Sequence, residues 1–313
     1  MNLLLCIINY YSLLLLMSIN KQVGLKRDTI DKFYTNAEVV LECYKNIKNH
    51  LGVKKGDLII EPSAGNGAFI EIIKSLTDNY RFYDIEPENN EIIKQDYLDS
   101  DLELNLNPEL NLEFNETMRI HVIGNPPFGR QSSLAIKFIK KSCGFCDTIS
   151  FILPKSFKKD SLKKHFRSSF HLIFECDLQE NSFLVNGKEY NVPCIFQIWE
   201  KKEYDRETLE KLEPKNFQFV KKTDNPDISF RRVGVYAGKI DTEIESKSEQ
   251  SHYFIKFDKE INFNTSDASD ASDNTSLSEI LDKLKPIEFK TDNTVGPRSI
   301  SKREVIKEFN EII

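Results

Sequence analysis

The sequence predicts an α/β protein with a mostly parallel sheet, extended by a small β-rich module and C-terminal helices. From Asp28 onward, strand-like apolar runs alternate with segments of helical periodicity, which is typical of a parallel sheet. A glycine-rich turn lies between the first such strand and its helix. The 313 residues are 40% hydrophobic and 29% charged, so the chain has enough apolar residues for a packed core.

The elements of the sheet follow in order from the apolar spacing. The expected strands are 57–61, 81–85, 119–123, 148–153 and 172–176, and the expected helices are 36–49, 68–76 and 133–141. Asn36 is positioned to cap the first of these helices. In the segment 182–199, Asn186-Gly187 predicts a two-residue hairpin turn, so we expect an antiparallel hairpin to close the edge of the sheet.

Composition divides the rest of the chain. Short β-like pieces follow the sheet, then an acidic, polar stretch that indicates a flexible linker, then two helices at 276–285 and 301–312. Ser301 and Glu304 have capping-box spacing at the start of the second helix. The predicted segments are an apolar N-terminal extension 1–27, a main domain 28–204, a β-rich module 205–263, a linker 264–275 and C-terminal helices 276–313.

Residues 3–16 form an apolar run that is shorter than the roughly 20 residues of a membrane-spanning helix. A signal peptide has Lys or Arg before its apolar run, and no Lys or Arg precedes this one. Because Met17 follows directly, we expect an upstream extension, with the functional chain beginning near Met17. A helix packed on the domain and a membrane anchor are the alternatives. We expect no stable membrane insertion.

Charge and cysteine content exclude further classes. With 43 Lys and Arg against 49 Asp and Glu, the net charge is -6, so the chain is not a polybasic coat protein and its nucleic-acid contacts must be local. Six cysteines without a secretory signal indicate a reducing compartment. We therefore expect an intracellular, cytoplasmic protein, with the nucleus or a viral factory as alternatives. Cys143 and Cys146 lack a second ligand pair, so we expect two buried residues at a helix end and no metal.

A ligand-binding turn is expected where the first strand meets its helix. The turn Glu61-Pro62-Ser63-Ala64-Gly65-Asn66-Gly67 carries glycines that let a ligand approach the backbone. It contains no Gly-Lys-Ser/Thr of a P-loop, and Ile70 departs from the dinucleotide fingerprint. Asp84, at the end of the next strand, is placed to accept hydrogen bonds from both ribose hydroxyls of a nucleoside. A plain strand-to-helix turn with a surface Asp is the alternative.

The run Asn125-Pro126-Pro127-Phe128 follows another predicted strand. Two consecutive prolines cannot continue a central strand, so the chain leaves it in a stiff turn. This turn can hold the Asn125 side-chain oxygen and the Pro126 carbonyl as two acceptors beside the Phe128 ring, an arrangement that suits a planar base with an exocyclic amine. If these two oxygens accept hydrogen bonds from the two N–H groups of the amine, the amine lone pair is aimed at an electrophilic methyl group. An ordinary Pro-Pro loop is the alternative.

Glu61 to Phe69, Asp84, Asp96 and the Asn125 to Phe128 motif, in this order, resemble the S-adenosylmethionine-dependent N6-adenine methyltransferases with the gamma order of motifs. Upstream, Phe33-Tyr34-Thr35 resembles the entry motif of that family, with Asn36 in place of the usual Pro. The resemblance covers about residues 28–200. Residues 124–159 are also similar to an uncharacterised phage, bacterial and large-DNA-virus methyltransferase-like group, and distantly to the catalytic core of the cap adenosine N6-methyltransferase.

The resemblance implies a Rossmann-like class I methyltransferase sheet over 28–204, a substrate module over 205–263 and S-adenosyl-L-methionine as cofactor. It implies catalytic roles for Asn125, Pro126, Pro127 and Phe128. The implied cofactor-binding residues are Tyr34, Thr35, Glu61, Pro62, Ser63, Gly65, Asn66, Gly67, Asp84, Ile85, Asp96 and Tyr97. Among these, Asp84 would contact the ribose, and Asp96 with Tyr97 the cofactor adenine.

A basic run from Lys155 to Arg167 carries six Lys or Arg against one Asp. Such a run can track phosphates, although a solvated helix face is the alternative. The candidate substrate-binding residues are Arg130, Lys155, Phe157, Lys158, Lys159, Lys163 and Lys164, with Phe157 expected to stack a base. Arg231 and Arg232 are similar candidates in the β-rich module.

The predicted function is methyl transfer to the N6 amine of adenine in nucleic acid, either DNA or RNA. Methylation of cytosine N4 or of a protein glutamine is an alternative, because an Asn-Pro-Pro-aromatic motif serves those amines and amides too. A catalytically idle nucleic-acid-binding subunit is a third hypothesis.

Overall fold

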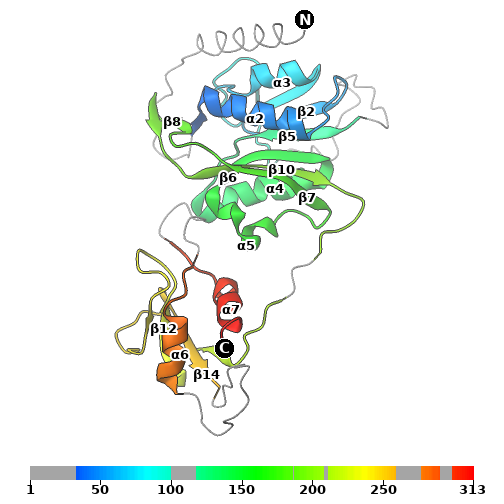
Figure 1. Cartoon of the computed structure of the whole chain (residues 1–313). Coiled ribbons are helices and arrows are strands. Elements are labelled where there is room, and N and C mark those ends of the chain that lie inside the picture. The colour runs from blue at the N-terminus through cyan, green and yellow to red at the C-terminus, as the bar shows by residue number, and fades with distance from the viewer. Residues whose placement is uncertain (1–32, 100–117, 186, 208–210, 259–275, 290–297) are drawn as a thin grey trace, which may run out of the picture. The chain divides into compact units, whose positions relative to one another are not determined.

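The computed structural model describes residues 33–99, 118–185, 187–207, 211–258, 276–289 and 298–313. The chain forms two compact units, Met1–Thr208 and Leu209–Ile313 (Figure 1). The predicted extension 1–27 and the predicted linker 264–275 lie outside the described residues.

A mixed sheet forms the centre of the first unit. Its strands are β2 Leu58–Glu61, β3 Asn79–Asp84, β4 Ile93–Lys94, β5 Ile120–Gly124, β6 Thr148–Pro154, β7 Phe170–Asp177 and β10 Cys194–Lys201. These seven strands are ordered β4-β3-β2-β5-β6-β10-β7. The pairs β4–β3, β3–β2, β2–β5 and β5–β6 are parallel, whereas β10 runs antiparallel to both β6 and β7. The predicted Rossmann-like α/β sheet is confirmed, and its last strands along the chain are antiparallel.

The position of the predicted hairpin was wrong. The strands on either side of this predicted turn, β8 Phe183–Val185 and β9 Lys188–Tyr190, pair with each other and form a separate three-stranded sheet with β1 Tyr34–Thr35. The following strand, β10, enters the main sheet between β6 and β7, so β7 is the edge strand. Most of β10 is buried, including the large side chains of Phe196 and Trp199, which suits a strand with neighbours on both sides.

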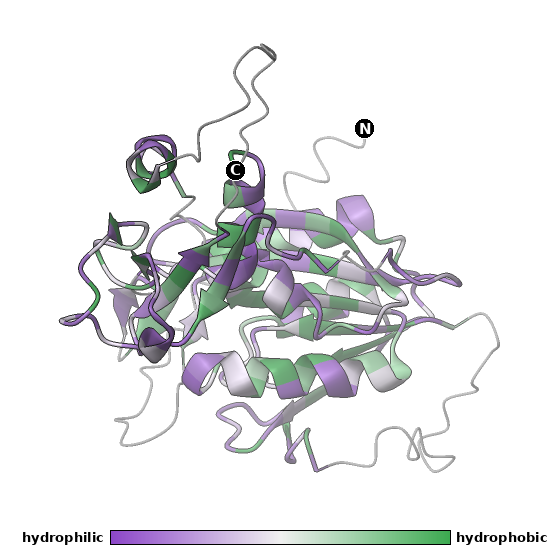
Figure 2. Ribbon diagram, turned by 90° about the horizontal axis from the view of Figure 1, so that it is seen from below, coloured by the Kyte–Doolittle hydropathy of each residue, from purple (hydrophilic) through white to green (hydrophobic). Residues whose placement is uncertain are grey.

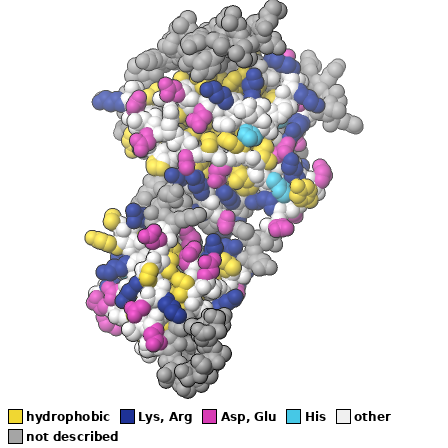
Figure 3. Space-filling view, viewed as in Figure 1, with side chains coloured by type: hydrophobic (Ala, Val, Ile, Leu, Met, Phe, Trp, Pro, Cys, Tyr) yellow, Lys and Arg dark blue, Asp and Glu magenta, His cyan; other side chains and the backbone are white. Residues whose placement is uncertain are grey.

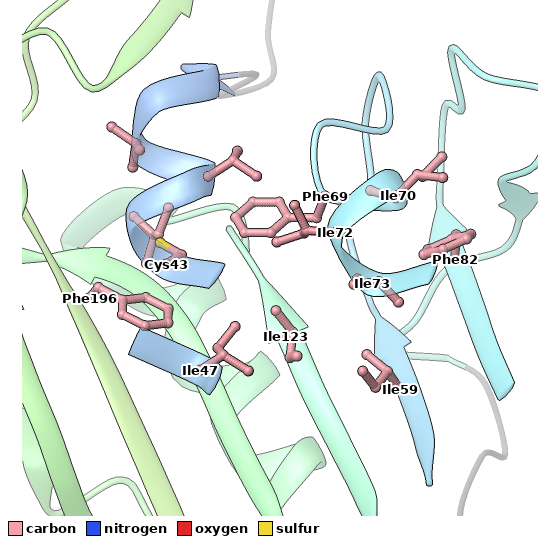
Figure 4. Packing of buried hydrophobic residues seen from close by; sticks show 14 of the residues in the cluster. Cys43, Ile47, Ile59, Phe69, Ile70, Ile72, Ile73, Phe82, Ile123 and Phe196 are labelled. Atoms are coloured by element: carbon pink, nitrogen blue, oxygen red, sulfur yellow. The ribbon is translucent and has the colours of Figure 1, made fainter. Parts of the chain in front are cut away.

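Helices cover both faces of the main sheet. Successive side chains of a strand point to opposite faces, and here both faces carry apolar side chains that the helices bury. The helices are α2 Ala37–His50, α3 Ile70–Leu76, α4 Ser133–Phe145 and the short α5 Asp160–Lys163. On one face, α2 and α3 pack with Ile59 and Ile123 (Figure 4). On the other face, α4 packs with Leu58 and Ile60. Figure 2 shows the resulting pattern of largely hydrophobic strands and helices of mixed hydropathy.

Two local predictions in the first unit are confirmed, the Asn36 cap and the burial of Cys143 and Cys146. The Asn36 side chain caps α2 by accepting a hydrogen bond from the Glu38 amide. Cys143 and Cys146 are both buried at the end of α4, and burial raises the pKa of the Cys143 thiol to about 11. Within the described ranges, no three or more His, Cys, Asp and Glu side chains are grouped so that they could hold a metal ion. No helix in the same ranges has both the length and the apolar character needed to cross a membrane.

The second unit has its own hydrophobic core. Its strands are β11 Phe217–Val220, β12 Ile228–Arg231, β13 Ile240–Asp241 and β14 His252–Phe257, and its helices are α6 Leu277–Leu284 and α7 Lys302–Asn310. The strands form an antiparallel sheet in the order β11-β14-β12-β13. Apolar side chains of both helices, such as Leu284 and Phe309, join those of the sheet in one cluster. The predicted capping box of Ser301 and Glu304 begins α7.

Candidate active site

A pocket opens at the carboxyl ends of β2 and β5. Strand order reverses between these strands, and in open α/β sheets ligands bind at such a switch point. The pocket is lined by Phe33, Tyr34, Pro62, Ser63, Gly65, Asp84, Ile85, Asp96, Tyr97, Leu98, Asn125, Pro126, Pro127, Phe128, Leu134 and Phe138. These walls enclose about 190 Å³. Small-molecule sites span roughly 300–1,000 Å³, so a nucleoside-sized ligand would extend beyond the described walls.

The pocket brings the two predicted motifs together. All four residues of the Asn125 to Phe128 motif line it, as do eight residues of the predicted cofactor set: Tyr34, Pro62, Ser63, Gly65, Asp84, Ile85, Asp96 and Tyr97. The other predicted cofactor residues, Thr35, Glu61, Asn66 and Gly67, are not in this lining.

Four lining residues were missing from the predicted site: Phe33, Leu98, Leu134 and Phe138. Leu134 and Phe138 are four residues apart on α4, so both point to one face of the helix that follows the proline motif. That helical spacing was the available signal. Phe33 belongs to the entry motif, and Leu98 follows Tyr97 directly.

The Asp84 carboxylate is fixed at the end of β3 by two backbone amides. Its Oδ2 accepts a hydrogen bond from the Gly65 amide at 2.8 Å, and its Oδ1 accepts one from the Glu86 amide at 2.8 Å. Gly65 has a φ of +55°, a conformation that few residues with a side chain adopt. Each carboxylate oxygen can accept a second hydrogen bond, so Asp84 is oriented and still able to bind a ligand hydroxyl.

The Asn125 side chain is held from one side only. Its Nδ2 donates to the Phe33 carbonyl at 3.1 Å and to the Thr35 Oγ1 at 3.3 Å. Its Oδ1 is buried and has no hydrogen-bond partner in the described part of the chain. The Ser63 hydroxyl also donates to the Asn125 carbonyl at 3.2 Å. The entry motif therefore sets the orientation of Asn125 and leaves its side-chain oxygen as an unused acceptor.

Glu61, the last residue of β2, is another buried acceptor. Its exposed fraction is 2%, and its Oε2 has no partner among the residues that the structure describes. Burial, and then the neighbouring Asp84 carboxylate, raise the pKa of Glu61 well above its usual range. An unpaired buried carboxylate is costly unless a cation or a proton neutralises it.

Aromatic rings fix the position of Phe128. Its ring stacks on Phe33 with centroids 6.3 Å apart and meets Phe183 edge-on at 6.4 Å. Phe33 in turn stacks on Tyr190 of β9 at 5.6 Å. The small β1-β8-β9 sheet thereby supplies aromatic support beside the proline motif, and Tyr190 remains 49% exposed.

Tyr97 and Asp96 occupy another wall of the pocket. The buried Tyr97 ring stacks on Phe138 at 5.2 Å, and its hydroxyl shares a hydrogen bond of 2.8 Å with Ser142. The Asp96 Oδ1 accepts a hydrogen bond from the Leu98 amide at 2.8 Å, while the residue itself is exposed. The wall therefore combines a fixed flat ring with an accessible carboxylate.

The structure corrects the expectation for Phe157. This ring is 0% exposed and belongs to the core, because the short 3-10 helix Lys155–Lys158 turns it inward, so it cannot stack a base.

Much of the basic run is paired with carboxylates of the edge strand β7. Lys155 and Lys158 form ion pairs with Asp177 at 3.4 and 2.6 Å, and Lys163 pairs with Glu175 at 3.1 Å. Lys159 is half-buried, whereas Lys164 and Arg130 are exposed. Positive and negative side chains are accordingly interspersed on the face shown in Figure 3.

No family model and no curated protein matches the chain. Solved structures that resemble it include a provisionally assigned RNA methyltransferase from Pyrococcus horikoshii, with 16% identity, a TM-score of 0.45 and coverage of 61% of this chain and 97% of the other. A provisionally assigned class I S-adenosylmethionine-dependent methyltransferase from Listeria monocytogenes has 14% identity and a TM-score of 0.43, covering 64% and 70%. The methyltransferase subunit of a type I restriction-modification system from Streptococcus thermophilus has 15% identity and a TM-score of 0.39, covering 56% and 46%.

Proposed function

We propose that this chain transfers a methyl group from S-adenosylmethionine to the exocyclic N6 amine of adenine in nucleic acid. The observation that carries the proposal is the Asn125 side chain, whose buried Oδ1 has no partner in the described ranges although its Nδ2 has two. Buried polar atoms are rarely left unpaired, so this acceptor fits a donor that a ligand brings. An exocyclic amine is such a donor.

The residues around the pocket fit the cofactor. Asp84 has acceptor capacity left for the two ribose hydroxyls, and the unpaired Glu61 carboxylate suits the ammonium group of the methionine part. Ile85, which is 46% exposed, and the fixed Tyr97 ring offer apolar surfaces for an adenine. When bound, S-adenosylmethionine supplies an electrophilic methyl group.

The protein's part in the reaction is to position the amine. Its lone pair is delocalised into the base, so it is a poor nucleophile in the planar form. The Asn125 Oδ1 and the Pro126 carbonyl would accept its two N–H bonds, which favours the pyramidal form and directs the lone pair toward the methyl group. The Phe128 ring, held by Phe33 and Phe183, would orient the plane of the base. The methylated amine then loses a proton to water.

Exposed cations support nucleic acid as the substrate. Arg130 lies two residues after Phe128 and is exposed. Lys140 of α4 and Lys164, directly after α5, are exposed as well, and burial together with these two ammonium groups lowers the pKa of His165. Phosphate contacts of this kind would position a strand beside the pocket without selecting its sequence.

The proposal is tested in two steps. Calorimetry should show that the protein binds S-adenosylmethionine, and labelled methyl groups should then pass to DNA or RNA but not to a protein pool. Transfer to protein would support glutamine methylation instead. Cofactor binding with no transfer to any pool would contradict methyl transfer and favour an idle nucleic-acid-binding subunit.

A further inference from the structure

The second unit contains a cavity that is unrelated to the proline motif. It has a volume of about 500 Å³, within the range of roughly 300–1,000 Å³ for small-molecule sites. Strands β12, β13 and the start of β14 contribute to its walls, together with the two loops 232–239 and 242–251. We call this cavity the Arg231 pocket.

Arg231 is held in place and keeps donors available. Its Nε donates to the Val233 carbonyl at 2.8 Å, and its Nη1 donates to the Ser251 hydroxyl at 3.4 Å. A guanidinium has five N–H donors, so two bonds leave others for an anion. Such a fixed fork is well suited to a phosphate group.

Arg231 and two lysines are the cationic residues of the pocket, and they differ in how far they are paired. Lys247 pairs with Asp241 at 2.9 Å and with Glu243 at 3.4 Å, so two carboxylates in and beside the pocket share one ammonium group. Lys239, by contrast, is exposed and its ammonium makes no hydrogen bond or ion pair within the described ranges. After Lys247, Lys239 also lies close enough to Asp241 to help lower the pKa of that carboxyl. The three cations nevertheless outnumber the carboxylates of Asp241 and Glu243, so a net positive charge remains for a ligand.

An exposed aromatic ring borders these cations. Tyr236 lines the pocket and is 72% exposed, and its neighbour Val235 is 79% exposed. A ring beside cationic groups forms a stacking surface for a base whose phosphate binds next to it. His252, which faces Arg231 across strands β12 and β14, has its Nδ1 within hydrogen-bond distance of the Ser248 carbonyl at 3.1 Å and of the Ser251 hydroxyl at 3.0 Å, so the ring is fixed at the edge of the pocket.

We propose that the Arg231 pocket binds a nucleotide of a single-stranded nucleic acid, with its phosphate on Arg231 and Lys239 and its base stacked on Tyr236. The choice of a nucleic-acid strand rests on the proposed function, whereas the site itself is independent of the active-site pocket. It would hold the substrate at a nucleotide other than the one that is methylated.

The test measures binding of fluorescein-labelled 12-nucleotide DNA and RNA single strands to the full chain by fluorescence anisotropy at several salt concentrations. Tyr236→Ala should weaken binding about fivefold to hundredfold, the range for loss of one stacked base, while Tyr236→Phe keeps the ring and should bind normally. Lys239→Glu should weaken binding and lower the slope of log affinity against log salt by about 0.7. Lys307→Glu, an exposed lysine of α7 outside the pocket, is the charge-matched control and should leave the slope nearly unchanged.

Unchanged affinity in both Tyr236→Ala and Lys239→Glu would overturn the proposal, as would an equal loss in Lys307→Glu. Adenosine monophosphate serves as the competitor: if it binds as tightly as the 12-nucleotide strands, the pocket is a free-nucleotide site and the assignment to a strand is wrong. Calorimetry with S-adenosylmethionine distinguishes a failure of this proposal from a failure of the proposed methyl transfer. Variants that keep cofactor binding but lose strand binding support the Arg231 pocket even if no methyl transfer is found.

Discussion

Buried polar groups lie at both ends of strands β2 and β5, but their hydrogen bonding differs. At the amino end, the Asp57 carboxylate accepts hydrogen bonds from the Lys54 amide at 2.7 Å, the Arg119 amide at 3.1 Å and the His121 ring at 3.3 Å. At the carboxyl end, Glu61 and Asn125 each keep a buried oxygen without a partner among the described residues.

The pKa values show the same contrast. Burial opposes ionisation of Asp57, but the Lys54 and Arg119 amides and His121 outweigh it and lower the pKa of this carboxyl. Burial and the Asp84 charge raise the pKa of Glu61 instead. Both carboxylates are almost fully buried, at 1% and 2% exposed. Neither side chain has much accessible surface, but Glu61 lies deeper and lacks donors among the described residues, whereas the fold supplies three donors to Asp57. This difference separates an end that stabilises the sheet from an end left open for a ligand.

The largest effect is expected for Asn125→Ala. This change removes an acceptor aimed at the reacting amine, so turnover should fall by roughly 10²–10³-fold, the loss seen when one preorganised polar group is removed. Cofactor affinity by calorimetry should stay nearly intact, and Asn46→Ala on the outer part of α2 should leave turnover unchanged. Near-normal turnover in Asn125→Ala would remove the mechanistic basis of the account.

At the opposite end, Asp57→Ala should lower the free energy of unfolding by about 3 kcal/mol. The change leaves buried donors unpaired, at a cost of about 1–3 kcal/mol each. Urea denaturation followed by circular dichroism measures it, with the exposed Asp78→Ala as control. A loss of activity without a loss of stability in Asp57→Ala would contradict the division between the two ends.

Asp84→Ala should weaken cofactor binding by about 1.5–3 kcal/mol, the range for hydrogen bonds to a charged group. The variant also loses the acceptor for the Gly65 amide, so the thermal midpoint is compared with that of the wild type. Unchanged affinity in calorimetry would show that Asp84 does not bind the ribose.

Binding of the cofactor should release protons from Glu61. Its raised pKa favours the protonated form in the free protein, and an ammonium ligand would favour the ionised form, so affinity should rise as the pH rises through the pKa of Glu61. Calorimetry in two buffers with different ionisation enthalpies measures the released protons. Glu61→Gln should abolish the release and, by removing an unpaired buried carboxyl, leave the unfolding free energy equal or higher. The same proton release in Glu61→Gln would exclude this role.

The smallest effect concerns stability in mild acid. Burial lowers the pKa of His121 below its usual 6.5. Below pH 6.5 the unfolded chain therefore binds more protons than the folded chain, and the free energy of unfolding decreases as the pH decreases. Asp57 adds a second loss as pH falls below its unfolded value of 3.8 and through its lower folded value. His121→Gln should flatten the first part of the curve, measured by urea denaturation between pH 5 and 7. An unchanged slope would show that His121 does not carry it.

Features set by neighbouring residues were predictable from the sequence. The Asn36 cap and the capping box of Ser301 depend on residues two or three positions apart, and both were predicted. The location of the site at strand ends followed from the order of strands and motifs, since Pro62 and Asn125 each come directly after a strand. The expected roles of Asp84 and of the Asn125 to Phe128 motif were read from their chemistry, whereas those of Asp96 and Tyr97 came from the resemblance.

Features that depend on distant partners were not predictable. The placement of β10 between β6 and β7 requires pairing on both sides, which the local hairpin signal does not report. The bonds from Asn125 to Phe33 and Thr35 join residues about 90 positions apart. Likewise, the inward turn of Phe157 depends on the tertiary core rather than on the charge pattern around it.

Identification of the methylated product tests the central claim most directly. Wild-type protein and Asn125→Ala are incubated with S-adenosylmethionine and with DNA or RNA, and the digested nucleosides are identified by mass spectrometry. We expect N6-methylated adenosine or deoxyadenosine from the wild type and almost none from Asn125→Ala. N4-methylated cytosine, or N6-methylated adenine formed equally by both proteins, would contradict the claim.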